Sequence, residues 1–188
     1  MPPASSTIKS SSPPTVLLVP GWLNSGPEHW QSLWEKSNPH FVRVVQKNWT
    51  EPVPKDWVLA IERAIDAAPG PVVIAAHSLG CLACQMISPI HLSRIVGALL
   101  VAAADLDRSE CPRVLENFRP MPIQKIPFRS ILVVSSNDDW ATLERSEQFA
   151  SQWGSDLVNI GPRGHINSDS GLAGWPDGFA LLEVLTHS

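Results

Sequence analysis

The sequence predicts an α/β protein in which one sheet of about six mainly parallel strands lies between two layers of helices. Short apolar runs alternate along the chain with helix-length amphipathic segments, which is typical of repeated βαβ units. The first run, Thr15–Val19, is continuously apolar and is closed by Pro20, as expected for a strand with both faces buried. We therefore expect a doubly wound sandwich that binds ligands at the carboxyl ends of its strands.

Composition narrows the class of protein further. The chain has 188 residues, of which 44% are hydrophobic and 17% charged, a balance that suits one globular domain. Its net charge of −4 provides no basic field, so neither a nucleic acid nor a membrane surface is expected as a partner. Three cysteines are too few for a disulfide framework, which favours a reducing compartment.

The first fourteen residues differ from the rest of the chain. They contain five Ser and four Pro and have no apolar stretch of the kind found in export signals. We expect residues 1–14 to form a disordered tail, residues 15–188 to form a single domain, and the protein to be cytoplasmic.

The later elements follow from the same alternation of segments. Further strands are expected at 41–45, 72–76, 95–101 and 131–134, with a weaker one at 157–160. Helices are expected at 28–36, 55–67, 79–87, 142–153 and 177–185. Pro69 and Pro71 separate the second helix from the third strand, because proline cannot continue a helix. The proline-rich segment 105–127 is expected to be irregular, with at most one short helix near 113–118.

The sharpest motif is Ala-His-Ser-Leu-Gly at residues 76–80, directly after the third strand and before a helix. This pattern is typical of a nucleophile elbow, in which the turn carrying the serine needs small residues two positions before and after it. Ala76 and Gly80 meet that requirement, with Ala in place of the usual Gly. A plain serine-capped turn is the alternative.

A serine nucleophile needs a histidine base and an acid that orients the base. In this fold class they follow the serine in the order acid, then histidine, at the ends of later strands. Asp138 and Asp139 follow the fifth strand, and His165 lies in a loop after the sixth, so the order agrees. Asp105, after the fourth strand, is a third candidate for the acid.

An oxyanion hole would complete such a site with two backbone N–H groups. One is expected from Leu79, the residue after the serine, and the other from Trp22 in the loop after the first strand.

The sequence resembles the small serine hydrolases that include retinoblastoma-binding protein nine and bacterial YdeN. The resemblance covers residues 16–185 and rests on VPGW at 19–22, EHWQ at 28–31, AHSLG at 76–80, SNDD at 136–139, GHIN at 164–167 and GWP at 174–176. It implies a compact α/β-hydrolase fold without a cap domain and a triad of Ser78, Asp139 and His165.

The family's acid is commonly followed by proline, which places the acid at Asp139. Trp140 stands where that proline would be, so Asp138 stays open as the acid. Residues 82–86 lack the glutamate of Leu-x-Cys-x-Glu, so retinoblastoma binding is not implied.

The remaining aromatic and polar residues divide between core and pocket. Trp30, Trp34, Trp57 and Trp153 are expected in the core, and Trp140 and Trp175 near the pocket. For His29, substrate contact and helix packing are both open, whereas packing is expected for His77. Cys81 and Cys84 have redox-motif spacing but lie within one helix, where two buried small side chains are the better interpretation.

These observations predict a serine hydrolase that cleaves a small ester or other acyl bond through an acyl-enzyme. No cofactor or metal is expected, because the other histidines have no partners at metal-ligand spacing. Two alternatives stay open: a catalytically silent interaction protein with the same fold, and a Cys-x-x-Cys oxidoreductase.

Overall fold

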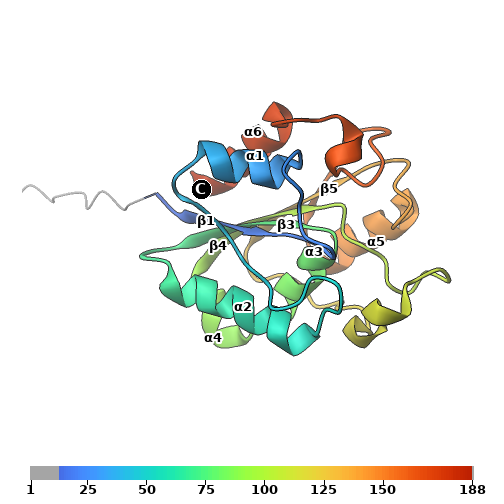
Figure 1. Ribbon diagram of the computed structural model, residues 1–188, viewed down its shortest axis with the longest axis horizontal. Helices are drawn as coiled ribbons and strands as arrows, with labels where there is room; N and C mark the ends of the chain where they lie inside the picture. The colour runs from blue at the N-terminus through green and yellow to red at the C-terminus, as the bar shows by residue number, and fades with distance from the viewer. Residues whose placement is uncertain (1–12, 188) are drawn as a thin grey trace, which may run out of the picture.

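Six parallel strands form one sheet in the computed structural model, which describes residues 13–187 (Figure 1). The strands are β1 Thr15–Val19, β2 Phe41–Arg43, β3 Val72–His77, β4 Ile95–Val101, β5 Arg129–Val134 and β6 Asp156–Asn159. Their order across the sheet is β2-β1-β3-β4-β5-β6. The expected fold class is confirmed. The tail expected at 1–14 lies outside the described residues except for Pro13 and Pro14.

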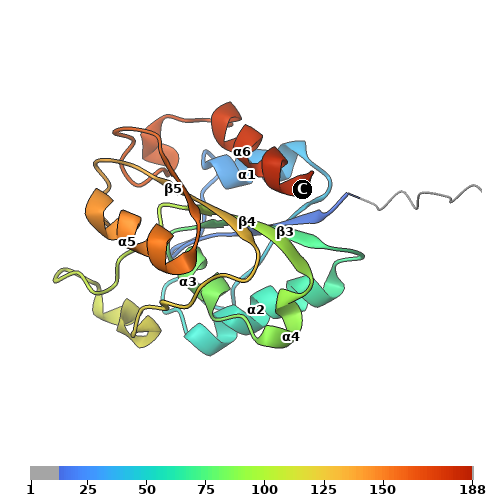
Figure 2. The same cartoon turned by 180° about the vertical axis from the view of Figure 1, so that it is seen from behind.

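Helices cover both faces of the sheet (Figures 1 and 2). Helices α1 Trp30–Ser37 and α6 Pro176–Thr186 lie on one face. The other face carries α2 Pro54–Ala67, α3 Leu79–Gln85, α5 Leu143–Trp153 and the short α4 Pro89–Leu92. This arrangement is the three-layer sandwich that the alternation of apolar runs predicts.

Alternating side chains of the strands supply two apolar cores. Leu17 and Val19 pack toward α2, α3 and α5, whereas Val16 and Leu18 pack toward α1 and α6. The two faces of each strand are thus buried against different helices, which explains the continuously apolar runs. All four tryptophans expected in the core are buried there: Trp30, Trp34, Trp57 and Trp153.

The sheet order places the carboxyl ends of two particular strands side by side. From β1 the chain passes outward to β2 on one side, and β3 then pairs with β1 on the other side. The strand order therefore reverses between β1 and β3, which is where open α/β sheets bind ligands. Gly21, after β1, and Ser78, after β3, lie at this position.

Several element boundaries differ from the expected ones. Helix α1 begins at Trp30 because the ring of His29 accepts a hydrogen bond from the Gln31 N–H and so caps the helix. Strand β2 ends at Arg43, beyond which Val45 is exposed. Helix α3 ends at Gln85, and the unexpected α4 begins with Pro89. The residue before a proline is disfavoured in a helix, so the chain does not continue as one helix from α3 into α4.

The longest connection between strands is the proline-rich segment 102–128, between β4 and β5. A 3₁₀ helix at Arg113–Phe118 is the one short helix expected in the proline-rich segment. Within residues 13–187 no segment forms a cap domain over the strand ends. Nor does this part of the chain contain a helix long and apolar enough to cross a membrane.

Candidate active site

Ser78 occupies a strained turn between β3 and α3. Its backbone angles are φ 53° and ψ −123°, a combination that residues with a side chain rarely adopt. Contacts on both sides hold the turn: the Ser78 N–H donates to the Val101 carbonyl at 2.9 Å, and its carbonyl accepts from the Cys81 N–H at 3.0 Å. The strand, tight turn and helix expected around residues 76–80 are confirmed.

Two glycines allow the loop after β1 to approach this turn. A Cβ at Gly80 would lie 2.5 Å from the Val19 carbonyl oxygen, so any side chain there would push α3 away from β1. A Cβ at Gly21 would lie 2.8 Å from the Ser78 Cβ and 3.3 Å from its Oγ. The backbones of residues 19–21 and 78–80 can therefore meet only because both positions lack a side chain.

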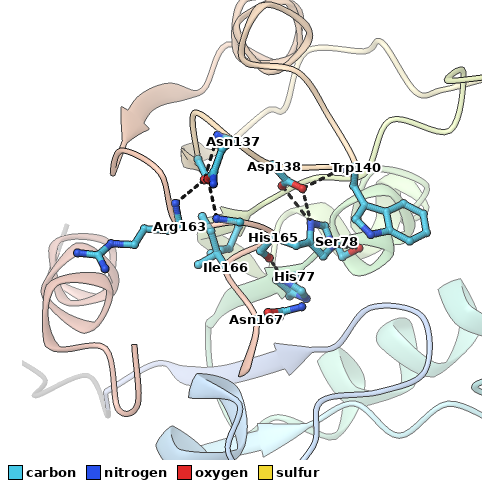
Figure 3. A network of polar contacts seen from close by, with 12 residues as sticks. His77, Ser78, Asn137, Asp138, Trp140, Arg163, His165, Ile166 and Asn167 are labelled. Carbon is cyan, nitrogen blue, oxygen red and sulfur yellow. Dashed lines mark hydrogen bonds and ion pairs between the residues drawn. The ribbon is translucent and has the colours of Figure 1, made fainter. Parts of the chain in front are cut away.

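A chain of hydrogen bonds leads away from the Ser78 hydroxyl (Figure 3). The Ser78 Oγ lies 2.8 Å from Nε2 of His165, and Nδ1 of the same ring lies 2.9 and 3.0 Å from the two carboxylate oxygens of Asp138. The Asp138 side chain is only 4% exposed. With Nδ1–H donating to the carboxylate, the lone pair of Nε2 faces the serine hydroxyl, as a base requires.

The carboxylate that contacts His165 in the structure is that of Asp138, and not that of Asp139, for which the sequence gives the preference. Asp138 also accepts a hydrogen bond from the Trp140 N–H at 2.9 Å, which turns its carboxylate inward. Asp139, on the exposed surface of the described chain, makes no hydrogen bond or ion pair with His165. Two neighbouring side chains in this loop point in different directions, and the loop turns Asp138 toward the ring.

Asp105 is also excluded as the partner of His165. Its carboxylate lies 3.3 Å from Nε of Arg145, on helix α5. It also accepts a hydrogen bond from the Asp107 N–H, so it holds its own loop rather than the histidine.

The two N–H groups expected in an oxyanion hole flank the serine. Leu79 begins helix α3, where a first-turn N–H has no acceptor within the helix. Trp22 follows Gly21, and its ring nitrogen donates to the Thr50 carbonyl at 3.0 Å. Within residues 13–187 neither backbone N–H has a protein acceptor, so both are free for a ligand.

These groups face one cleft of about 420 Å³ at the carboxyl ends of β1 and β3. Its walls bring together most of the residues singled out in the sequence: Trp22, His29, Ser78, Leu79, Trp140 and His165. The rings of Trp22 and Trp140 meet edge to face with centroids 6.3 Å apart. They form an aromatic wall beside the serine.

Trp175 was expected near the pocket, and this expectation is wrong. Its ring is 3% exposed and packs against Trp30 and Trp34 in the core under α1 and α6. Gly178 provides the space, because a Cβ there would lie 2.2 Å from the indole ring. The residue therefore anchors α6 to the sheet instead of lining the cleft.

Two further histidines pack beneath His165. The His77 ring lies 4.9 Å from the His165 ring and 4.7 Å from the His29 ring, centroid to centroid. Burial is the main cause that lowers the pKa of His29 to about 3 and that of His77 well below its usual value. Both rings are neutral near pH 7. His77 donates from Nε2 to the His165 carbonyl at 2.9 Å, so it has a hydrogen-bonding role as well as the expected packing role.

The two cysteines of helix α3 are buried. Burial raises the pKa of Cys81 to about 12 and that of Cys84 well above its usual value. A redox cysteine needs an accessible thiolate, so the geometry disfavours the oxidoreductase alternative. Within residues 13–187, no cluster of three or more His, Cys, Asp or Glu side chains could hold a metal ion.

Ser135 and Asn137 join the loop after β5 (the acid loop) to the loop after β6 (the histidine loop), a role that the sequence does not predict. Their position within three residues before Asp138 is the only signal the sequence contains.

Comparisons with known proteins show the family to which the chain belongs. The family model described as "Serine hydrolase" matches residues 16–184. A YdeN-like hydrolase from Pectobacterium atrosepticum is 33% identical in sequence, with a TM-score of 0.80 and 92% of each chain covered. The chain belongs to the serine hydrolase family. The expected resemblance to YdeN is thereby confirmed, and the family supports hydrolase activity.

Other solved structures extend the likeness in fold. This serine hydrolase is 18% identical to the ydeN gene product of B. subtilis, with a TM-score of 0.73 and coverage of 93% of this chain and 100% of that one. A monoacylglycerol lipase from Paleococcus ferrophilus is 13% identical, with a TM-score of 0.67 and coverage of 94% and 96%. A comparison with curated proteins gives no match. At these identities the two structures support the α/β-hydrolase fold and nothing finer.

Proposed function

We propose that this serine hydrolase cleaves small esters or other acyl bonds with a triad of Ser78, His165 and Asp138. The observation that carries the proposal is the 2.8 Å contact between the Ser78 Oγ and Nε2 of His165, whose Nδ1 is held by a buried carboxylate. A serine in a strained turn with a base at this distance is arranged to lose its proton as it attacks.

The reaction has two halves. The Ser78 Oγ attacks the carbonyl carbon of the substrate while His165 Nε2 takes the hydroxyl proton. The tetrahedral intermediate collapses, His165 returns the proton to the leaving group, and an acyl-serine remains. Water then attacks the acyl group, with His165 again taking a proton, and the acid product and free serine are released. Asp138 keeps Nδ1 protonated and stabilises the imidazolium that forms twice in each cycle.

Backbone N–H groups of Trp22 and Leu79 would hold the negative oxygen of each tetrahedral intermediate. Both flank Ser78 and neither has an acceptor within residues 13–187. Donors fixed in this way stabilise charge that develops only in the transition state, and losing one typically costs about 10²- to 10³-fold in kcat.

The cleft favours a small-molecule substrate with modest apolar groups. Trp22 and Trp140 form an aromatic wall, His29 contributes a neutral ring, and no cap domain covers the opening in the part of the chain described. Short-chain esters in free solution therefore fit better than substrates presented at a lipid surface. Trp140 and His29 are proposed as pocket residues, and Trp175 is not.

Steady-state hydrolysis of 4-nitrophenyl acetate and butyrate tests the proposal against its alternatives. We expect turnover with an initial burst of nitrophenol, no turnover by Ser78→Ala, and full turnover by Cys81→Ala. A purified, folded wild-type chain that hydrolyses neither ester nor the corresponding amides would favour the silent interaction protein.

A further inference from the structure

Two side chains of the acid loop hold the backbone of the histidine loop (Figure 3). The Ser135 Oγ accepts a hydrogen bond from the Arg163 N–H at 2.8 Å and donates to the Asn137 Oδ1 at 2.9 Å. The same Asn137 Oδ1 accepts from the Gly164 N–H at 2.8 Å. We call Ser135 and Asn137 the loop bracket. Its two contacts with the histidine loop join residues that are 28 and 27 positions apart in the chain.

The loop bracket acts one residue away from each half of the triad contact. Asn137 directly precedes Asp138, and Gly164 directly precedes His165. A single oxygen atom of Asn137 thus connects the backbone that carries the acid to the backbone that carries the base. Gly164 has φ 56°, so the chain turns sharply at the point where it is held.

Other contacts fix the far side of the histidine loop. His77 donates to the His165 carbonyl at 2.9 Å, and the Trp30 indole donates to the Ile166 carbonyl at 3.0 Å. Both hold carbonyl groups after the ring position, whereas the loop bracket holds N–H groups before it. Besides the contact of Asp138 with the His165 ring, the loop bracket ties the histidine loop to side chains of the loop that provides the carboxylate, and it does so through backbone N–H groups.

We propose that Asn137 is a positioning residue, which sets the spacing between Asp138 and His165 by holding the Gly164 N–H. The proposal rests on the proposed triad. Asn137 is exposed and lies outside the lining of the cleft, so it acts through His165 and not on the substrate. Loss of its Oδ1 would leave the Gly164 N–H and the Ser135 hydroxyl without this acceptor, shift the imidazole and leave the binding surface unchanged.

The test compares Asn137→Leu and Asn137→Ala with Asn137→Asp, which keeps an oxygen in the same place. For the first two we expect kcat to fall by about 10- to 100-fold with KM nearly unchanged, because displacement by about 1 Å can cost about 10²-fold. Asn137→Asp should restore kcat to within about threefold of wild type. Ser136→Ala is the matched control, since the Ser136 side chain is exposed and its backbone alone makes a hydrogen bond.

A spectroscopic readout separates this proposal from the proposed function. The proton on Nδ1 of His165, held by Asp138, should give a downfield ¹H resonance that is lost in Asp138→Asn. We expect it to shift or broaden in Asn137→Leu and Asn137→Ala and to be kept in Asn137→Asp and Ser136→Ala. This result would support the positioning role of Asn137 even if the wild type hydrolysed no ester. Wild-type kcat and an unchanged resonance in whichever of the two variants folds would overturn it.

Discussion

Both carboxylate oxygens of Asp138 lie within hydrogen-bonding distance of Nδ1 of His165, at 2.9 and 3.0 Å. The contact selects the ring tautomer in which Nε2 is free to accept the proton of Ser78. Because the Asp138 side chain is almost completely buried, little water competes for that carboxylate.

Substitution of the two neighbouring aspartates should separate their roles. In Asp138→Asn the amide cannot hold the same tautomer, so we expect kcat to fall by orders of magnitude, about 10⁴-fold in the template triad, with little change in KM. Asp139→Asn should stay close to wild type, because that side chain is exposed. Steady-state kinetics of the two purified variants checks this, and equal losses in both would argue against the assignment.

Acid should destabilise the fold through the buried histidines. In the unfolded chain their pKa is about 6.5, whereas burial lowers that of His29 to about 3 and that of His77 well below 6.5 in the folded chain. Below about pH 6.5 the unfolded chain therefore binds protons that the folded chain does not, and stability falls as the pH drops. Each histidine contributes up to ~1.4 kcal/mol per pH unit to that slope.

Urea unfolding between about pH 7 and about pH 5 measures this slope directly. His29→Asn should remove the contribution of one titrating group from this slope. Asparagine can still cap helix α1, but it does not titrate. An unchanged slope in this variant would mean that His29 is already protonated in the folded chain.

A methyl group at Gly21 should impair catalysis more than folding. The new Cβ of Gly21→Ala would lie 2.8 Å from the Ser78 Cβ and 3.1 Å from the His77 carbonyl oxygen, so the loop must move away from the nucleophile. We expect kcat/KM to fall by about 10²-fold, since the Trp22 N–H would leave its position. Gly70→Ala, where a Cβ has nothing within 4 Å, provides the control. Equal activity of the two variants would contradict the close approach.

Thiol reactivity should distinguish the three cysteines. Cys111 is partly exposed, whereas Cys81 and Cys84 are buried and burial raises the pKa of Cys81 to about 12. Ellman's reagent should therefore modify one thiol rapidly in the folded chain and all three after unfolding. Rapid reaction of Cys81 or Cys84 in the folded chain would reopen the redox interpretation.

The sequence predicted the layers of the fold and the elements that carry the site, because both depend on local patterns. Thr15–Val19 and Ile95–Val101 match their expected strands, and the turn at Ser78 lies where its small neighbours indicate. The choice between Asp138 and Asp139 depends instead on how one loop turns. Two identical neighbouring side chains contain no signal for that direction.

Trp175 and Asn137 also make contacts that the sequence could not predict. The ring of Trp175 reaches the core because Gly178, one turn further along the chain, leaves room for it. Asn137 meets Gly164 only after both loops have folded at adjacent strand ends. Neither contact follows a helical or strand period, so sequence periodicity could not reveal them.

Labelling with a fluorophosphonate probe is the most direct test that Ser78 is a nucleophile activated by His165. Mass spectrometry of the digested wild-type chain should find one covalent adduct, on the peptide that contains Ser78. Ser78→Ala should give none, and His165→Ala should react far more slowly while keeping the wild-type circular dichroism spectrum. Undiminished labelling of Ser78→Ala, or an adduct on another peptide, would contradict the assignment of Ser78 as the nucleophile.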